Sequence, residues 1–152
     1  MSLEEKNKAT IRKGIEAVNE RNLALLDELM ASDFVDHTLQ IRGLAGAKQV
    51  YNMFFKGFPD FHMDIEDIVA EGDMVWVRLK STGTHTGEFY LPTPSGKIMT
   101  LAPTGKKITI KSVNIRRVVE GKIIEGWNVT DSLDLLKELG VIEYKGFPDE
   151  VK

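Results

Sequence analysis

The chain has 152 residues, of which 42% are apolar and 28% are charged, and its formal net charge is −3. Such proportions are typical of a soluble globular protein with a single domain. There is no cysteine, which excludes disulfides, thiolate metal sites and cysteine nucleophiles. The basic side chains are scattered, which argues against nucleic-acid binding, and no apolar run reaches the ~20 residues of a membrane span. The first residues, MSLEEKNK, are polar and acidic, so we expect no signal peptide and a cytoplasmic location.

The N-terminal part of the sequence predicts three helices. Ser2 and Glu5 have the form of a capping box, and apolar residues follow them at helical spacing. Asn22 can cap a second helix with the sequence LALLDELM. A third helix follows Gly43 and ends at Gly57. Between the second and third helices, the piece DFVDH is expected to be extended.

The next segment alternates between apolar and polar residues, which predicts a β-hairpin with one buried face. A three-residue loop at 71–73 would pair Val69 with Val75 and Ile65 with Leu79, so that apolar residues share a face. We prefer this loop to a two-residue loop, which would set Val75 against Ala70, Val77 against Ile68 and Leu79 against Glu66.

The second half of the chain predicts one more hairpin and a closing helix. Residues 87–105 contain three prolines and are expected to form a long loop or lid, not a strand. A second hairpin over 106–119 and 122–131 turns at Glu120-Gly121. A helix over 132–139 and a tail over 141–152 complete the chain.

Helices grouped apart from antiparallel strands indicate an α+β fold. We expect a single domain over 1–152, with its core at about 3–140. A strongly curved antiparallel sheet packed on the N-terminal helices would leave a cavity between the two layers, and a ligand site would lie in that cavity.

The second hairpin allows a prediction of which side chains face this cavity. With a two-residue turn, Asn114 lies opposite Trp127 and Ile110 lies opposite Asp131 on one face. A few polar groups among apolar side chains are typical of a small-molecule pocket. The opposite face is mixed and could be an interface between subunits. A single β-bulge would invert part of this assignment.

A lone carboxylate in such a pocket can take a proton from carbon and return it to an oxygen, so Asp131 is our candidate acid/base group. His85 and His37 are the candidate second groups. The competing interpretation is that Asp131 only caps the helix that follows it. Tyr51, on the apolar side of the third helix, and Arg78, on the opposite strand parity, are further candidates for ligand binding. The three histidines lack metal-ligand spacing, so we expect no metal site.

Several motifs occur in an order that resembles the SnoaL-like polyketide cyclases, of the nuclear transport factor 2-like superfamily. They are VDH, FPD, AEGD, V-x-R, GTHTGEF, PTGKK and EGKIIEGWNVTD-x-x-x-LL-x-x-LG, between about Asp33 and Gly140. The resemblance implies a cone-shaped α+β barrel, a homodimer or homotetramer, and no cofactor. It also implies an aldol ring closure in which the acid/base role falls on Asp131, at the W-x-x-x-D position. Family members often carry a histidine at or near Asn114, and their segment between GEF and PTGKK is usually shorter.

Three functions are consistent with these features. The first is an enzyme that binds a small apolar or aromatic carbonyl compound and moves a proton without a cofactor, as an aldol-type cyclase or isomerase. The second is a non-catalytic binding or carrier protein of the same fold. In the enzyme, Trp127 and Asn114 are candidate ligand contacts together with Tyr51 and Arg78. The third is an adaptor subunit that associates through the outer face of the sheet.

Overall fold

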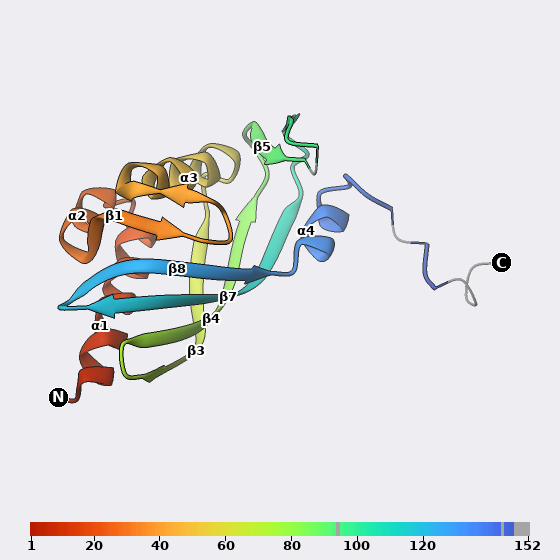
Figure 1. Ribbon diagram of the computed structural model, residues 1–152. Helices are drawn as coiled ribbons and strands as arrows, with labels where there is room; N and C mark the ends of the chain where they lie inside the picture. Colours follow the sequence, from red (N-terminus) through yellow and green to blue (C-terminus); the bar gives the residue numbers. More distant parts are fainter. Residues whose placement is uncertain (94, 144, 148–152) are drawn as a thin grey trace.

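The computed structural model describes residues 1–93, 95–143 and 145–147, so part of the tail expected over 141–152 lies outside the described residues. Figure 1 shows helices packed on a curved sheet of long strands. The helices are α1 (Leu3–Asn19), α2 (Leu26–Leu29), α3 (Gly43–Gly57) and α4 (Ser132–Glu138). The strands are β1 (Met30–Asp36), β2 (Ile41–Arg42), β3 (His62–Glu71), β4 (Met74–Thr84), β5 (Phe89–Pro92), β6 (Ile98–Leu101), β7 (Lys107–Val119) and β8 (Lys122–Thr130).

The predicted first and third helices are confirmed, and the second is shorter than expected. The Ser2 hydroxyl accepts a hydrogen bond from the Glu5 backbone N–H at 3.1 Å and so caps α1. Helix α3 ends at Gly57 as predicted. A 3₁₀ turn at Leu23–Leu25 precedes the single turn of α2, and the Asn22 side chain makes no capping bond there. Strand β1 therefore begins at Met30, earlier than the expected extended piece.

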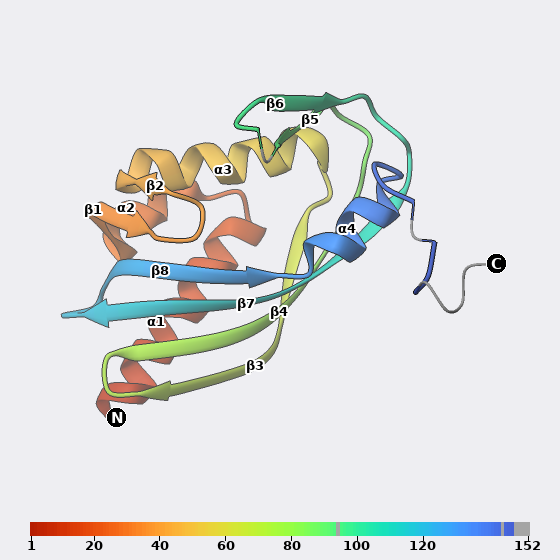
Figure 2. The same cartoon turned by 45° about the vertical axis from the view of Figure 1, so that its right-hand side comes forward.

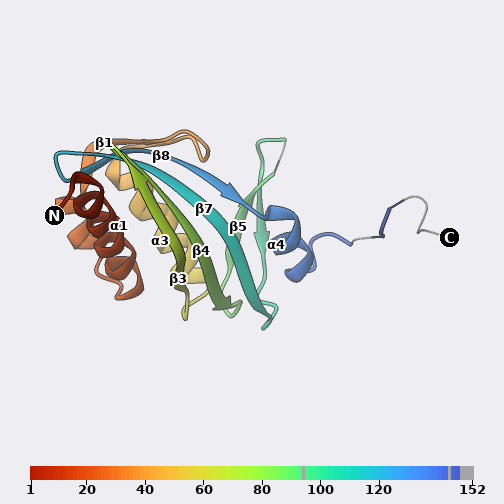
Figure 3. The same ribbon diagram turned by 90° about the horizontal axis from the view of Figure 1, so that it is seen from below.

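The larger sheet has six strands in the order β2-β1-β8-β7-β4-β3. All neighbours are antiparallel except β1 and β8, which are parallel. The sheet is curved but not closed, and α1 and α3 lie on its inner face (Figure 3). This arrangement confirms the α+β class with N-terminal helices on a mostly antiparallel sheet, whereas the expected barrel closure is absent from the described strands. No helix in the described residues is long and apolar enough to cross a bilayer.

The prediction that 87–105 contains no strand is wrong. β5 and β6 pair as a separate two-stranded sheet, which Figure 2 shows above the end of α3. Phe89 begins β5 and is almost completely buried against Phe54 and Phe58. Pro92 stands at the end of its strand, where a missing backbone donor costs little, so the prolines do not prevent pairing.

The three-residue loop predicted between β3 and β4 is also wrong. The turn has two residues, Gly72 and Asp73, and it pairs Ala70 with Val75. A β-bulge at Glu66 then changes the register by one. Beyond this bulge Ile65 lies opposite Leu79, as predicted from the apolar pattern.

A second bulge inverts part of the predicted cavity wall. The turn at Glu120-Gly121 has two residues, and Val118 lies opposite Ile123 as expected. Ile124 is an extra residue, so the next pair is Arg117 with Glu125, not Arg116 with Glu125. From there to its end, every β8 side chain lies on the face opposite to the predicted one, because successive side chains alternate along a strand.

Candidate functional site

A row of polar residues crosses the inner face of the sheet where β1, β8 and β7 meet. Asp36 lies beside Gly126, and Gly126 lies beside Arg116. A Cβ atom added to Gly126 would be 2.5 Å from Arg116 Nη1. The glycine between the two charged residues therefore provides the space that the guanidinium occupies.

The Arg116 guanidinium is held by neutral groups. Its Nη1 donates to the carbonyl oxygens of Ile115 and Trp127, each at 3.0 Å, and its Nη2 donates to Asn128 Oδ1 at 3.0 Å. No carboxylate in the described residues forms a salt bridge with it. Burial lowers the pKa of Arg116, while the nearby Tyr51 and Asp36 raise it. A guanidinium has five N–H donors, so Nε–H and one Nη2–H remain available for a ligand.

Asp36 is only 3% exposed, and it is the one buried carboxylate within 1–93, 95–143 and 145–147. Its Oδ1 accepts from the backbone N–H groups of Thr38 and Leu39, at 3.0 and 2.8 Å. Its Oδ2 accepts from Asn128 Nδ2 at 2.5 Å. Because Asn128 donates to Asp36, its amide oxygen is oriented toward Arg116. Asn128 thus links the carboxylate to the guanidinium.

Tyr51 and Asn114 complete the polar part of the site. The Tyr51 phenol, on α3, lies near both Arg116 and Asp36. Burial is the main cause that raises its pKa, while the Arg116 charge lowers the pKa and the Asp36 charge raises it. Asn114 lies two residues from Arg116 along β7 and so shares its face. Neither the Tyr51 hydroxyl nor the Asn114 amide hydrogen bonds to any residue that the structure describes, so both can bind a ligand.

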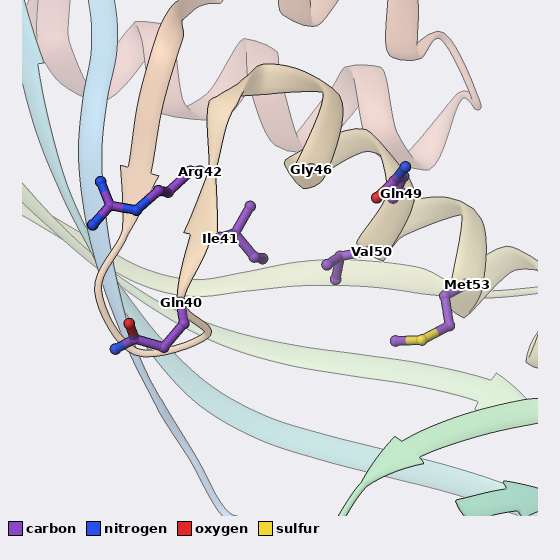
Figure 4. Close-up of a pocket in the computed structure, with 7 residues that line it drawn as sticks. All are labelled: Gln40, Ile41, Arg42, Gly46, Gln49, Val50 and Met53. Carbon is purple, nitrogen blue, oxygen red and sulfur yellow. The ribbon is translucent and has the colours of Figure 1, made fainter. Parts of the chain in front are cut away.

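A groove of about 430 Å³ lies between β2 and α3, and it is lined by Gln40, Ile41, Arg42, Gly46, Gln49, Val50 and Met53. In Figure 4 the side chains of Ile41, Val50 and Met53 point into the space between β2 and α3. Ile41 is the cross-strand neighbour of Asp36, so the groove runs along the same face as the polar row. The groove therefore adjoins the polar row at Ile41, and its apolar side chains are mixed with the polar Gln40, Arg42 and Gln49.

Asp131 lies outside this site. Its side chain is exposed, and its Oδ1 accepts from the Asp134 backbone N–H at 3.1 Å at the start of α4. This is the capping geometry of the competing interpretation. The predicted pairing of Asp131 with Ile110 is wrong, because the bulge shifts β8 by one residue and Ser112 already pairs with Thr130.

The two candidate histidines are also separated from the polar row. His37 lies on the outer face, where its Nε2 is 2.7 Å from Glu125 Oε2 and its ring stacks on Trp127 at 5.0 Å. His85 is completely buried beside Phe58, and its Nδ1 is 3.0 Å from the Thr104 hydroxyl. Burial lowers the pKa of His85, and its Nε2 has no hydrogen-bond partner among the described residues.

Two of the four predicted ligand contacts reach the site. Tyr51 and Asn114 face inward, whereas Trp127 faces outward opposite Ile115, and Arg78 forms an exposed ion pair with Asp67. The prediction that Trp127 and Asn114 share a face is therefore wrong, because the β-bulge at Ile124 moves Trp127 to the outer face. The described residues contain no group of three or more His, Asp or Glu side chains that could hold a metal ion.

Sequence reasoning missed three residues of the site, Asp36, Arg116 and Asn128. The VDH motif was singled out, but its histidine was chosen over its aspartate. A parity argument from the apolar Phe34 would have placed Asp36 inward, since Phe34 is buried and the two residues share a face. Arg117, and not Arg116, forms the ion pair with Glu125, which leaves the Arg116 guanidinium inside the site.

The comparisons with known proteins agree with this fold. The family model of the SnoaL-like polyketide cyclases matches residues 8–139, and the chain belongs to this family. No curated protein matches the chain in sequence.

Several solved structures have the same fold as this chain. AclR, a proposed hydroxylase from Streptomyces galilaeus, is 28% identical with a TM-score of 0.79, and the match covers 93% of this chain and 89% of AclR. A proposed polyketide cyclase from Bacillus cereus is 29% identical with a TM-score of 0.74, covering 91% of this chain and 83% of that one. IdmH, a proposed polyketide cyclase from Streptomyces antibioticus, is 31% identical with a TM-score of 0.70, covering 88% and 98%.

Proposed function

We propose that this protein is a cofactor-independent enzyme that moves a proton on a small carbonyl compound, as an aldol-type cyclase or an isomerase. The observation that carries the proposal is the largely buried Arg116 guanidinium, which keeps unused donors beside a free phenol and a buried carboxylate. Membership of the SnoaL-like family and the names of two neighbours support a cyclase. The name of a third neighbour, a proposed hydroxylase, shows that the fold alone does not fix the reaction.

In this proposal Arg116 and Tyr51 bind the carbonyl oxygen of the substrate. When a proton leaves the adjacent carbon, negative charge moves to that oxygen. Fixed donors in a water-poor site stabilise such charge strongly, because they need no reorganisation during the reaction. The raised pKa keeps the Tyr51 phenol protonated at neutral pH, so it can donate its hydrogen bond.

Asp36 is the proposed proton acceptor. A carboxylate has about four lone-pair positions, and Asp36 uses three of them for hydrogen bonds. The remaining position can take the proton from carbon. The groove lined by Ile41, Val50 and Met53 would hold the apolar or aromatic part of the substrate next to it.

Two isosteric variants test this assignment against the one that the family resemblance implies. Asparagine caps helices about as well as aspartate, so Asp131→Asn preserves the start of α4. We expect Asp131→Asn to keep most of the turnover and Asp36→Asn to lose about 10²-fold or more. Turnover would be measured on diketones and aryl ketones, by deuterium exchange at the carbon next to the carbonyl. If Asp131→Asn abolishes exchange and Asp36→Asn does not, the acid/base group is Asp131.

The three hydrogen bonds that Asp36 accepts also favour a second function, a non-catalytic binding protein. A carboxylate held by three donors is well suited to orient Asn128 and Arg116, and it need not accept a proton for that purpose. A binder would retain its ligand unchanged. Mass spectrometry of a bound ketone before and after incubation in heavy water separates the two functions, since only the enzyme incorporates deuterium.

A further inference from the structure

The pair of strands β5 and β6 is a separate piece of the fold, and we call these two strands the flap. Among the described residues the flap forms its own two-stranded sheet and pairs with no strand of the larger sheet. Figure 2 shows it above the end of α3. Phe89 is its deepest anchor, since this side chain is 1% exposed, whereas Ile98 on β6 is 70% exposed. The flap can therefore open as a unit if its attachment is released.

His85 lies at the base of the flap, where both ends of the flap leave the rest of the fold. Its backbone N–H donates to the Lys106 carbonyl, and its carbonyl accepts from the Gly105 N–H, each at 2.8 Å. These two bonds hold the segment by which the chain returns from β6. On the outgoing side, the Gly87 N–H donates to the Gly57 carbonyl at the end of α3, at 3.1 Å. A change at His85 therefore acts on both ends of the flap.

The imidazole ring of His85 is enclosed by aromatic side chains from the body and from the flap. The residue is completely buried, and its ring centroid is 5.2 Å from that of Phe58 and 6.4 Å from that of Phe89. Its Nδ1 is 3.0 Å from the Thr104 hydroxyl oxygen, whereas Nε2 has no partner among the described residues. A neutral ring carries one N–H, but a protonated ring carries two. The second N–H and its charge would be buried without an acceptor, which costs free energy.

The charged side chains next to His85 do not compensate a second proton on the ring. They come from the end of α3 with its following loop, from the start of the flap and from the returning segment, and they are Lys56, Asp60, Glu88, Lys106 and Lys107. Asp60 accepts its hydrogen bonds from Thr84. Glu88 accepts from the Tyr90 hydroxyl. The lysines are cations, which oppose a further positive charge. Burial lowers the pKa of His85 by more than the Gly87 backbone raises it.

We propose that His85 is an acid-sensitive latch for the flap. At neutral pH the neutral ring is buried between Phe58 and Phe89 and keeps the flap closed. In acid the ring gains a second N–H, and the flap opens so that water can solvate the charge. Opening the flap costs less than unfolding the domain, because in the described chain it shares no strand pair with the larger sheet. The open flap would uncover Phe54 on α3, which Phe89 now contacts, and this inference does not depend on the proposed function.

Hydrogen exchange, measured amide by amide, tests the proposal in the natural chain. The amides of β5 and β6 are compared with those of β4 and β7 at neutral pH and at about pH 5, after correction for the chemical exchange rate. We expect the opening equilibrium of the flap to rise about 10- to 30-fold in acid, because an exposed imidazole favours the open state up to tenfold more per pH unit below ~6.5. The amides of β4 and β7 should change much less. A flap whose exchange changes no more than that of β4 and β7 would overturn the proposal.

A pair of matched variants within the flap tests the same coupling in the other direction. If protonation opens the flap, a weaker anchor must make protonation easier, since coupling between two equilibria is reciprocal. Phe89→Ala removes the buried anchor, so the pKa of His85 should rise toward its usual value of about 6.5, as followed by the NMR shifts of the ring nitrogens. Ile98→Ala changes an exposed side chain of the flap and should leave that pKa where it is. The same pKa in both variants would contradict the proposal.

Removing the titrating ring should abolish the acid response. Glutamine stays neutral over this pH range, so in His85→Gln the exchange of the flap amides should be the same in acid as at neutral pH after correction. His62 is the control, because it is exposed on β3, and His62→Gln should keep the opening in acid. An acid-induced opening that persists in His85→Gln would show that another group is responsible.

Discussion

On the inner face of β7 and β8 a guanidinium and two amides lie between the sheet and the helices, whereas on the outer face of the same strands the indole of Trp127 lies opposite Ile115. Buried polar groups cost free energy unless they are hydrogen-bonded, and exposed apolar rows favour association. At this point both faces therefore depart from the usual distribution, although the rest of the inner face is the apolar core. The comparison shows that the two faces of these strands differ in chemistry, with hydrogen-bonded polar groups inside and apolar side chains outside.

The two adjacent arginines of β7 give the sharpest contrast between the faces. Arg116→Met removes the donor from two carbonyl oxygens and from the Asn128 amide oxygen. We expect it to lower the free energy of unfolding by at least about 2 kcal/mol, because buried acceptors would lose their partners. Arg117→Met, on the outer face, breaks only solvent-accessible ion pairs and should cost clearly less. Urea unfolding measures both, and equal losses would contradict the comparison.

Two glycine substitutions test how tightly the inner face is packed. A Cβ at Gly126 would lie 2.5 Å from the Arg116 guanidinium, so Gly126→Ala should destabilise by about 1–3 kcal/mol. At Gly14 in α1 the nearest atom to such a Cβ is 4.0 Å away, and Gly14→Ala should stabilise by up to about 1 kcal/mol. Thermal unfolding of the two variants should therefore shift in opposite directions. A stabilising Gly126→Ala would mean that Arg116 is not confined as described.

The cap at Asp131 predicts a loss of stability that is similar to, or smaller than, the loss expected for Gly126→Ala. Asp131→Ala removes the acceptor for the Asp134 N–H and should cost about 0.5–2 kcal/mol, whereas Asp131→Asn should be close to neutral. The measurement is urea unfolding at neutral pH. If the asparagine variant loses as much as the alanine variant, the carboxylate has a role beyond the cap.

The pH dependence of stability distinguishes an inward histidine from an outward one. Burial lowers the folded-state pKa of His85 below its unfolded value of about 6.5. As the pH falls, His85 is therefore protonated in the unfolded chain before it is protonated in the folded chain. Its contribution to the free energy of unfolding is complete above pH ~6.5 and is lost as the pH falls toward the lowered folded-state pKa. His85→Gln should reduce this loss of stability in acid. The exposed His62 offers the control, and a similar change in His62→Gln would contradict the assignment to burial.

The sequence by itself determined the class of the fold and most of its elements. Apolar periodicity, the Ser2 cap and the stop at Gly57 predicted α1, α3 and both long hairpins, since these features depend on neighbours in the chain. The motif order also indicated the family. The polar residues of β7 were assigned to the correct face, and Asn114 and Tyr51 were correctly expected to face inward.

The tertiary structure alone decided which residues of β1 and β8 lie beside the polar residues of β7. One extra residue at Ile124 moved Trp127 to the outer face and Asn128 to the inner face, and local periodicity contains no signal for such a bulge. The parallel pairing of β1 with β8 then brought Asp36 beside Gly126, although the two are far apart in the chain. A strand register is fixed by the packing of a whole face, so a one-residue shift moves every following side chain of the strand to the other face of the sheet.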